Sequence, residues 1–285
     1  IRATAGYNTF TVSVYCMNRF LAPTLQLLKT CLTDIIFPQK EIDLMQQNAL
    51  AKLKVSKETN DFLADVAFKK NIFGAQHPYG YETSEIAIQQ ISQELLLQFY
   101  KKDLQLNNAT LFIAGKYGKT ELDLIEQYLG TMPVSTSLPT KAAPVFIDDF
   151  SQQKISIQKP NSVQASIIIG KTFFNKHHAD YPAFLLLNTI FGGYFGSRLM
   201  SNIREEKGLT YGIYSSLSTL KYTGIFSIQT DTNLENLEVC LREIYLEMER
   251  LQNELIDDHE ITLARNYLLG KFLGRTDGPF NQIEV

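Results

Sequence analysis

The sequence FLLLNTIFGGYFGSRLMSNIREEKGLTY, residues 184–211, decides the fold of this chain. It begins as an apolar helix, breaks at Gly192-Gly193 and is expected to restart as a second helix near Ser197. Gly208 is expected to end that helix, because glycine takes the left-handed conformation at a helix C-terminus without a Cβ penalty. An extended run follows, so the stretch predicts a helix, a glycine break, a second helix and a strand.

Two polar side chains fall at the junction between the second helix and the strand. Arg204 is placed on the last turn of the helix and Tyr211 at the start of the strand. A fixed cation and a phenol that point into one cleft can hold a backbone carbonyl, or the anion that forms when it is attacked. A structural role fits the spacing as well: Arg204 would favour its helix C-terminus through the macrodipole, and Tyr211 would be half-buried in a sheet.

Length and composition exclude several classes of protein. The chain has 285 residues, enough for two ordinary domains, and is 45% hydrophobic and 20% charged with a net charge of −3. This balance predicts no nucleic-acid partner, because there is no excess of basic residues. No apolar run approaches the roughly 18 residues that a membrane span needs, so no span is expected.

The cysteines do not indicate a disulfide framework or a zinc knuckle. Cys16, Cys31 and Cys240 are odd in number and widely spaced, without a C-x-x-C pair. They are expected to be small buried hydrophobic residues. The chain begins with Ile1 rather than Met, which led us to expect a fragment or a processed form.

Hydrophobic periodicity predicts alternating helices and strands in two stretches separated by a linker. The linker is 131–145, which holds three prolines and no helical or strand period. It divides a first lobe, 1–130, from a second lobe, 146–285. Predicted strands are 7–16, 109–114, 152–158, 163–174, and a pair formed by the run from Tyr211 with 224–230. Predicted helices begin after Asn18 and Ser92, which are expected to act as N-caps, and after Phe37-Pro38 and Asn233. Two further helices are predicted over 61–71 and 120–129.

The two lobes repeat one plan. A strand leads through an asparagine into an amphipathic helix in both, and the following helices share a pattern. The matching segments are Phe10 to Asn18 with Phe226 to Asn233, and Glu41-Ile42-x-Leu44 with Glu260-Ile261-x-Leu263. So long a period indicates a duplicated domain. The predicted fold class is therefore α+β, with two homologous lobes that each carry a mostly antiparallel sheet covered by helices on one face. The register of the repeat implies a first lobe without its opening segment and a second lobe without its closing segment.

The motifs G-G-x-x-x-S-R-L, from Gly192, and R-E-E-K-G-L-T-Y, from Arg204, together with the repeat, resemble the insulinase/pitrilysin family of zinc peptidases. These are the inverzincins, which include the mitochondrial processing peptidase. The resemblance covers the whole chain, including Phe37-Pro38 and the turn His77-Pro78-Tyr79-Gly80. It implies that Arg204 and Tyr211 contact a peptide substrate, and that Gly192, Gly193 and Ser197 flank it.

The zinc motif of this family is absent from the chain. The family uses H-x-x-E-H on a helix, with two histidines as zinc ligands and the glutamate as activator of the bound water. The residues in the corresponding place of the second lobe, 186–190, offer no metal ligand. In the first lobe the corresponding place would lie upstream of Ile1. The four histidines, His77, His177, His178 and His259, are expected at the surface or in turns.

A further glutamate ligand is also missing. In active members it lies inside the helix that follows Phe-Pro, but here that helix has no glutamate between Glu41 and Glu58. The corresponding positions fall near 49–52, where alanine and lysine do not suit zinc. The resemblance therefore implies no catalytic residue and no metal ligand in this chain, with zinc expected in a partner subunit or an upstream segment.

Three hypotheses follow. The leading one is a non-catalytic subunit of a two-subunit zinc metallopeptidase, which binds peptide through the Arg–Tyr pair and the glycine-rich loop and associates with a homologous subunit. The second is a structural or peptide-binding homologue without a proteolytic role. The third is an active zinc peptidase whose H-x-x-E-H motif lies upstream of the sequence, with Glu58 as the nearest candidate for the later ligand.

Overall fold

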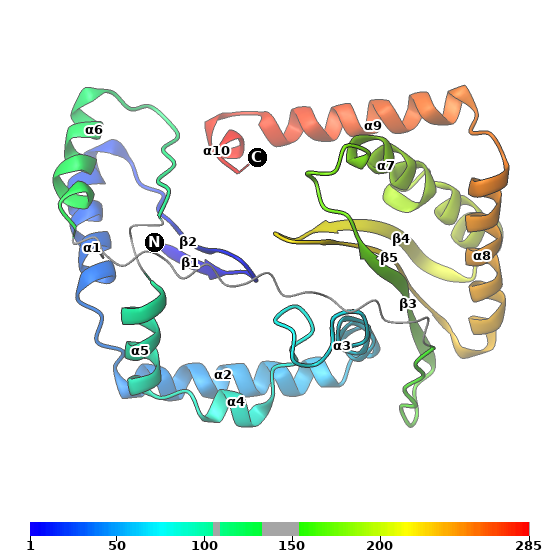
Figure 1. Ribbon diagram of the computed structural model, residues 1–285, viewed down its shortest axis with the longest axis horizontal. Coiled ribbons are helices and arrows are strands. Elements are labelled where there is room, and N and C mark those ends of the chain that lie inside the picture. Colours follow the sequence, from blue (N-terminus) through cyan, green and yellow to red (C-terminus); the bar gives the residue numbers. More distant parts are fainter. Residues whose placement is uncertain (105–108, 133–153, 285) are drawn as a thin grey trace. The chain divides into compact units, whose positions relative to one another are not determined.

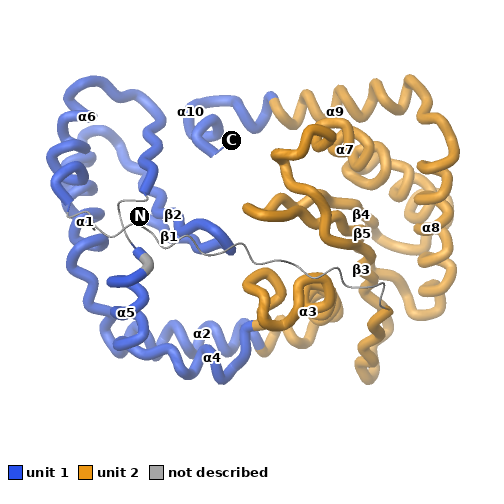
Figure 2. Tube along the Cα trace, in the orientation of Figure 1, with its two compact units in different colours: residues 1–53, 83–143, 273–285 blue, residues 54–82, 144–272 orange. Residues whose placement is uncertain are grey.

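A computed structural model describes residues 1–104, 109–132 and 154–284 of the chain (Figure 1). The chain forms two compact units, each assembled from separate stretches of sequence (Figure 2). Unit 1 comprises 1–53, 83–143 and 273–285, and unit 2 comprises 54–82 and 144–272. Most of the predicted linker, 131–145, lies outside the described residues.

Two long helices carry the chain from one unit into the other. Helix α2 (Gln39–Lys57) begins in unit 1 and ends in unit 2, whereas α9 (Asp258–Thr276) begins in unit 2 and ends in unit 1. These two helices contain the repeated Glu-Ile-x-Leu pattern. The compact units therefore differ from a single division of the sequence into 1–130 and 146–285, because each half of the chain contributes a segment to both units.

Unit 1 has a small hairpin and several helices. Strands β1 (Arg2–Ala5) and β2 (Phe10–Ser13) pair antiparallel, with Arg2 opposite Ser13. The helices are α1 (Leu21–Thr33), which the short η1 (Asn18–Phe20) precedes, α4 (Glu85–Gln89), α5 (Gln93–Asp103), α6 (Lys119–Ile125) with the π-helical turn η3 (Glu126–Gly130), and α10 (Pro279–Gln282). Ser92 caps α5 as predicted, since its Oγ accepts a hydrogen bond from Leu95 N at 3.2 Å.

Three predictions for unit 1 are wrong. The strand expected over 7–16 is confined to β2, because the chain turns before Phe10 and pairs with β1. Asn18 caps no helix with its side chain; its Nδ2 instead donates to Lys116 O at 2.8 Å and to Glu121 Oε1 at 3.1 Å. The apolar run 109–114 forms no strand, and Phe112 is 67% exposed. The run pairs with no strand in the part of the chain that the structure describes.

Unit 2 is organised by a three-stranded antiparallel sheet in the order β3-β5-β4. Its strands are β3 (Gln164–Phe173), β4 (Thr210–Thr219) and β5 (Gly224–Asn233), as the sequence predicts for 163–174, the run from Tyr211, and 224–230. The strand expected over 152–158 is absent from its described part, 154–158. The combination of helices with small antiparallel sheets confirms the predicted α+β class.

Helices pack on both faces of this sheet, so the prediction that they cover one face only is wrong for unit 2 (Figure 1). On one face, Ile213 and Ile228 are buried by the π-helical turns η4 (Thr189–Gly193) and η5 (Met200–Glu206) and by α8 (Leu237–Asn253). Helix α7 (Tyr181–Asn188) lies on the same face and continues into η4, and the short η6 (Leu234–Asn236) leads into α8. On the other face, α3 (Asn60–Phe73) and the turn after it bury Ile225. Ile225 and Ile228 of β5 point to opposite faces because side chains alternate along a strand.

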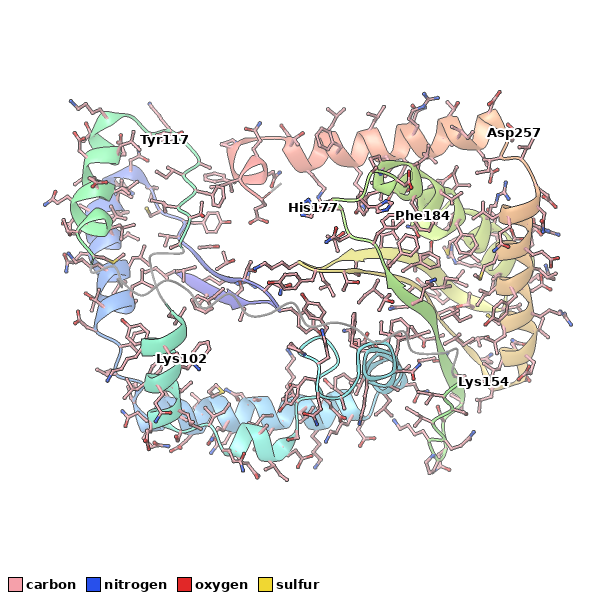
Figure 3. All side chains as sticks on the ribbon, in the orientation of Figure 1. Lys102, Tyr117, Lys154, His177, Phe184 and Asp257 are labelled. Carbon is pink, nitrogen blue, oxygen red and sulfur yellow. The ribbon has the colours of Figure 1, made fainter. Side chains whose placement is uncertain are left out.

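Aromatic side chains fill one end of the sheet. Phe184 of α7 lies with its ring centroid 4.5 Å from that of Phe173 and 5.8 Å from that of Phe226 (Figure 3). Rings at such separations add to the stability gained from the buried area. This cluster anchors the start of residues 184–211 to strands β3 and β5.

Only one of the three cysteines is buried as expected. Cys240 of α8 is fully buried, and burial raises the pKa of its thiol to about 11. Cys16 and Cys31 are exposed. Of the helices described, none is long and apolar enough to cross a membrane.

His77 lies in a turn, as expected, and its side chain is buried. Its ring stacks on Phe73 with centroids 5.3 Å apart, and its Nδ1 accepts a hydrogen bond from Tyr79 N at 3.0 Å. Gly80 closes the turn, where a Cβ would collide with Gly74 O. Burial lowers the pKa of His77 below its ordinary value of 6.5, so the folded protein favours the neutral ring.

We expect His77 to make unfolding pH-dependent. An unfolded chain takes up a proton on this ring near pH 6.5, whereas the folded chain resists it. The free energy of unfolding therefore falls as the pH drops below about 6.5 and levels off below the folded pKa. Urea unfolding at about pH 7.5 and about pH 5.5 measures this loss. In His77→Asn, which keeps an acceptor for Tyr79 N, the loss should be smaller; an equal loss in both proteins contradicts the prediction.

Candidate functional site

Residues 184–211 have the predicted order of elements. Helix α7 continues directly into η4, which ends at Gly193; a helical segment starts near Ser197 and continues as η5. Gly208 ends it with φ of +62°, the left-handed conformation expected of this glycine. Strand β4 then starts at Thr210.

The structure brings Arg204 and Tyr211 together. The Arg204 Cζ lies over the Tyr211 ring, 5.6 Å from its centroid, and over the ring of Phe195, 4.6 Å from its centroid. Arg204 Nη1 donates to Glu205 Oε1 at 2.8 Å. The Arg204 side chain is 26% exposed, whereas Tyr211 is 93% and Phe195 60% exposed. These residues form a cationic site bordered by two open aromatic rings.

A β-bulge turns Tyr211 outward. The pairing of β4 with β5 shifts between Thr210 and Ile213, so Tyr211 and Gly212 together oppose one residue of β5. The Thr230 hydroxyl lies 2.9 Å from Gly212 O, and the Thr210 hydroxyl accepts from Gly212 N at 3.1 Å. These side chains satisfy backbone groups that the interrupted ladder leaves unpaired. The exposure of Tyr211 contradicts the alternative in which it is half-buried in the sheet.

Gly192 and Ser197 are buried inside unit 2, whereas Tyr211 and Phe195 are exposed. A Cβ on Gly192 would lie 2.6 Å from Ser215 N of β4, so only glycine lets η4 approach the sheet this closely. Gly193 is partly buried, and a Cβ there would meet Asn188 O at 3.2 Å. Ser197 is 1% exposed, and its Oγ has no hydrogen-bond partner among the described residues. The contact of these three residues with a peptide stays a prediction.

A buried polar network fixes η5 on α8. Asn202 Nδ2 donates to Glu247 Oε1 at 2.7 Å, and Lys207 Nζ donates to Glu243 Oε2 at 2.8 Å and to Asn202 Oδ1. Glu243 and Glu247 are 6% and 3% exposed, and Arg250 Nη1 donates to Glu247 Oε1 at 2.8 Å. The hydrogen bond from Lys207 lowers the pKa of Glu243, although burial acts in the opposite direction. Paired in this way, the two carboxylates set the position of the turn that carries Arg204.

The loop between the two helices is held by α9. Arg198 donates through Nε and Nη2 to the two carboxylate oxygens of Glu260, at 2.8 and 2.7 Å. Such a two-point contact fixes orientation as well as distance. Tyr194 stacks on Tyr267 with ring centroids 5.0 Å apart. Burial, together with the charge of Glu260, raises the pKa of Tyr194. Phe195 therefore lies in the short stretch of chain between Tyr194 and Arg198, both of which contact α9.

The residues at the place of the zinc motif do not fit a zinc ion. Within 186–190, the buried Oδ1 of Asn188 has no hydrogen-bond partner among the residues that the structure describes, and its Nδ2 donates to Ser215 O at 3.4 Å. The five residues include no imidazole, thiolate or carboxylate. His177, His178 and His259 are exposed, as expected. In the parts of the chain that the structure describes, no group of three His, Cys, Asp or Glu side chains could hold a metal.

Phe195 was missed by the sequence analysis. The available signal was an aromatic residue between Gly193 and Gly196, in a loop where small residues predominate. Phe195 and Arg204 are separated along the chain, so the sequence does not indicate that they are in contact. The contact forms because the loop folds back over the end of η5. The exposed ring distinguishes it from the aromatic residues of the core.

Comparison with known proteins gives consistent matches. The family profile described as the Peptidase M16 inactive domain matches residues 90–268. The chain is 21% identical over 239 residues to the uncharacterized zinc protease YmxG of Bacillus subtilis, covering 83% of this chain and 57% of that protein. It is 27% identical over 254 residues to the non-peptidase homolog YmxG of Helicobacter pylori, covering 85% and 56%.

A solved structure agrees with these matches. The crystal structure of a peptidase M16 inactive domain from Pseudomonas fluorescens superimposes with a TM-score of 0.74 at 28% identity, covering 87% of this chain and 60% of that one. The chain thus spans less than two thirds of the length of each of these three proteins.

Substituting Gly192 tests the close approach of η4 to β4. In Gly192→Ala the new methyl group must displace Ser215 backbone, so we expect a loss of about 1–3 kcal/mol in the free energy of unfolding, measured with urea. Gly270→Ala is the control: its Cβ would meet nothing within 4 Å on α9, and alanine should be neutral or stabilising by up to about 1 kcal/mol. Equal stability of the two variants would contradict the packing role.

Proposed function

The chain belongs to the peptidase M16 family, through the inactive domain of that family, and from this membership we propose that it is a non-catalytic homologue that binds peptide through Arg204 and Tyr211. The comparisons bear on the family and its inactive domain; peptide binding is our inference from the site. One observation carries it: Tyr211 stands almost fully exposed on a bulge beside the guanidinium of Arg204. Tyrosine and arginine are enriched among the residues that carry binding energy at interfaces, which favours a role of this exposed pair in contact with another molecule.

The chemistry of the pair suits a peptide carbonyl. The N–H groups of Arg204 that do not face Glu205 can donate to a carbonyl oxygen, and such charge-assisted hydrogen bonds are about twice as strong as neutral ones. The Tyr211 hydroxyl can donate a second hydrogen bond to the same oxygen or to the next peptide group. Because β4 and η5 are held by the core of unit 2, the site needs little reorganisation to bind.

We further propose that the protein acts with a homologous subunit that carries zinc, and that Arg204 and Tyr211 orient the peptide for cleavage by that partner. Relatives described as zinc proteases and as a non-peptidase homolog fit such a division of labour. A second candidate function is binding without any role in proteolysis. The description of the Helicobacter pylori relative as a non-peptidase homolog favours it.

Peptide binding can be measured directly. Fluorescence anisotropy with a library of labelled, unstructured peptides should give dissociation constants for the wild-type protein. In Arg204→Ala the affinity should fall about tenfold or more, because a hydrogen bond from a charged donor is lost. Arg265→Ala removes an exposed arginine of α9 and should leave binding unchanged. Equal affinities of wild type and Arg204→Ala would remove the proposed site.

The subunit arrangement needs a separate experiment. When the chain is mixed with a metal-bearing homologue, peptide turnover should appear and should fall in Arg204→Ala while association, measured by size-exclusion chromatography, persists. Stable association without turnover would favour the second candidate function. Zinc bound to the full-length polypeptide, measured by elemental analysis, would instead support an active enzyme whose motif lies outside residues 1–285.

A further inference from the structure

We propose that Phe195 is the positioning residue for Arg204: its ring holds the guanidinium so that the N–H edge faces a planar oxygen acceptor of the bound peptide. The inference rests on the proposed function and extends it to a residue that no sequence motif indicated. The Arg204 Cζ lies closer to the Phe195 ring than to the Tyr211 ring, 4.6 Å against 5.6 Å. Phe195 thus makes the nearer of the two aromatic contacts.

The residues next to Phe195 are anchored, although the Phe195 ring itself is exposed. The residue before it, Tyr194, stacks on Tyr267, and Ser197 N donates to Tyr194 O at 3.2 Å across the loop. Gly196 makes room for this arrangement, since a Cβ there would lie 2.8 Å from the Tyr194 ring. The loop therefore fixes the direction of Phe195 without burying its ring in the core, and 60% of the side chain remains open to solvent.

The contact limits how Arg204 can present its donors. A guanidinium is attracted to the face of an aromatic ring, and its hydrogen bonds are donated in its own plane, from its edges. Nη1 donates to Glu205, the one hydrogen-bond acceptor that the described residues provide for this guanidinium. With two rings beside the guanidinium and Nη1 bound to Glu205, the other N–H groups are left to donate to a ligand that binds over Tyr211.

The ligand chemistry is a planar acceptor, either an internal peptide carbonyl or a terminal carboxylate. Both accept hydrogen bonds from one edge of a guanidinium. Peptides with acetylated and amidated ends offer only the carbonyl, whereas the same peptides with a free C-terminus offer both. Tighter binding of the free acid would assign the terminal carboxylate, and equal binding would assign an internal carbonyl.

The first measurement does not depend on any peptide. In ¹⁵N-labelled protein, the Nε–Hε signal of Arg204, assigned by its loss in Arg204→Lys, should be displaced by the ring current of Phe195. Phe195→Leu keeps an apolar side chain of similar size but removes the ring, so the signal should move. Phe195→Tyr keeps the ring and should leave the signal in place. An unchanged signal in Phe195→Leu overturns the proposal.

The second measurement is peptide affinity in the same variants. Phe195→Leu should weaken binding about two- to fivefold, the range that an exposed cation–π contact supports, while Phe195→Tyr should stay near wild type. Tyr245→Leu, an exposed aromatic of α8, is the matched control and should bind like wild type. A merely structural role for Phe195 predicts that Leu and Tyr variants behave alike, and that result overturns the proposal.

The two failures can be told apart. If wild type binds peptides and Phe195→Leu binds them equally well, the positioning role is overturned and the proposed function stands. If wild type binds no peptide of the library, the proposed function is overturned, and the role of Phe195 toward a peptide falls with it even where the Arg204 signal responds to Phe195→Leu.

Discussion

Two buried carboxylates constrain the part of unit 2 that contains Arg204 and Tyr211. Glu243 and Glu247 lie almost fully inside unit 2, and a buried charge is tolerated only when it is paired and hydrogen-bonded. Asn202 and Lys207 supply those partners from the segment that also contains Arg204. The requirement to satisfy the carboxylates therefore fixes the end of η5 on α8. The backbone position of Arg204 therefore follows from an electrostatic demand in the interior, while its side chain makes contacts of its own with Phe195, Tyr211 and Glu205.

A zinc peptidase combines a metal site with an open surface for its substrate, and in the described part of this chain the open surface occurs without the metal site. The positions that correspond to the zinc motif hold apolar, amide and hydroxyl side chains next to β4, and these suit an interior and not a metal. The bulge at Tyr211 retains an open surface, although a bulge interrupts the ladder and requires the hydroxyls of Thr210 and Thr230 to complete the hydrogen bonding. The exposure of Tyr211 thus depends on backbone geometry, which does not require the presence of a catalytic group.

The outcome of the sequence predictions depended on how local their physical causes are. The stop at Gly208 and the cap at Ser92 were predictable because each depends on a few neighbouring residues. The run 109–114 has the composition of a strand, but a strand needs a partner, and the sequence of the run does not provide one. The burial of His77 depends on Phe73 and Tyr79, which contact its ring only because the turn after α3 folds back on the end of that helix. Phe195 was not predicted for a similar reason, since its contact with Arg204 depends on how the loop folds over the end of η5.

The passage of α2 and α9 between the two units also bears on how the chain acquires its structure during synthesis. Unit 1 needs residues 273–285 in addition to its early segments, and unit 2 needs 54–82 together with residues as late as 272. Neither unit can therefore be completed as soon as one continuous stretch of chain has emerged from the ribosome. Contacts between such distant segments slow folding, because a long loop must close before the contact forms. Until then the apolar faces of the early segments remain uncovered, and apolar surface exposed in this way favours aggregation of the nascent chain.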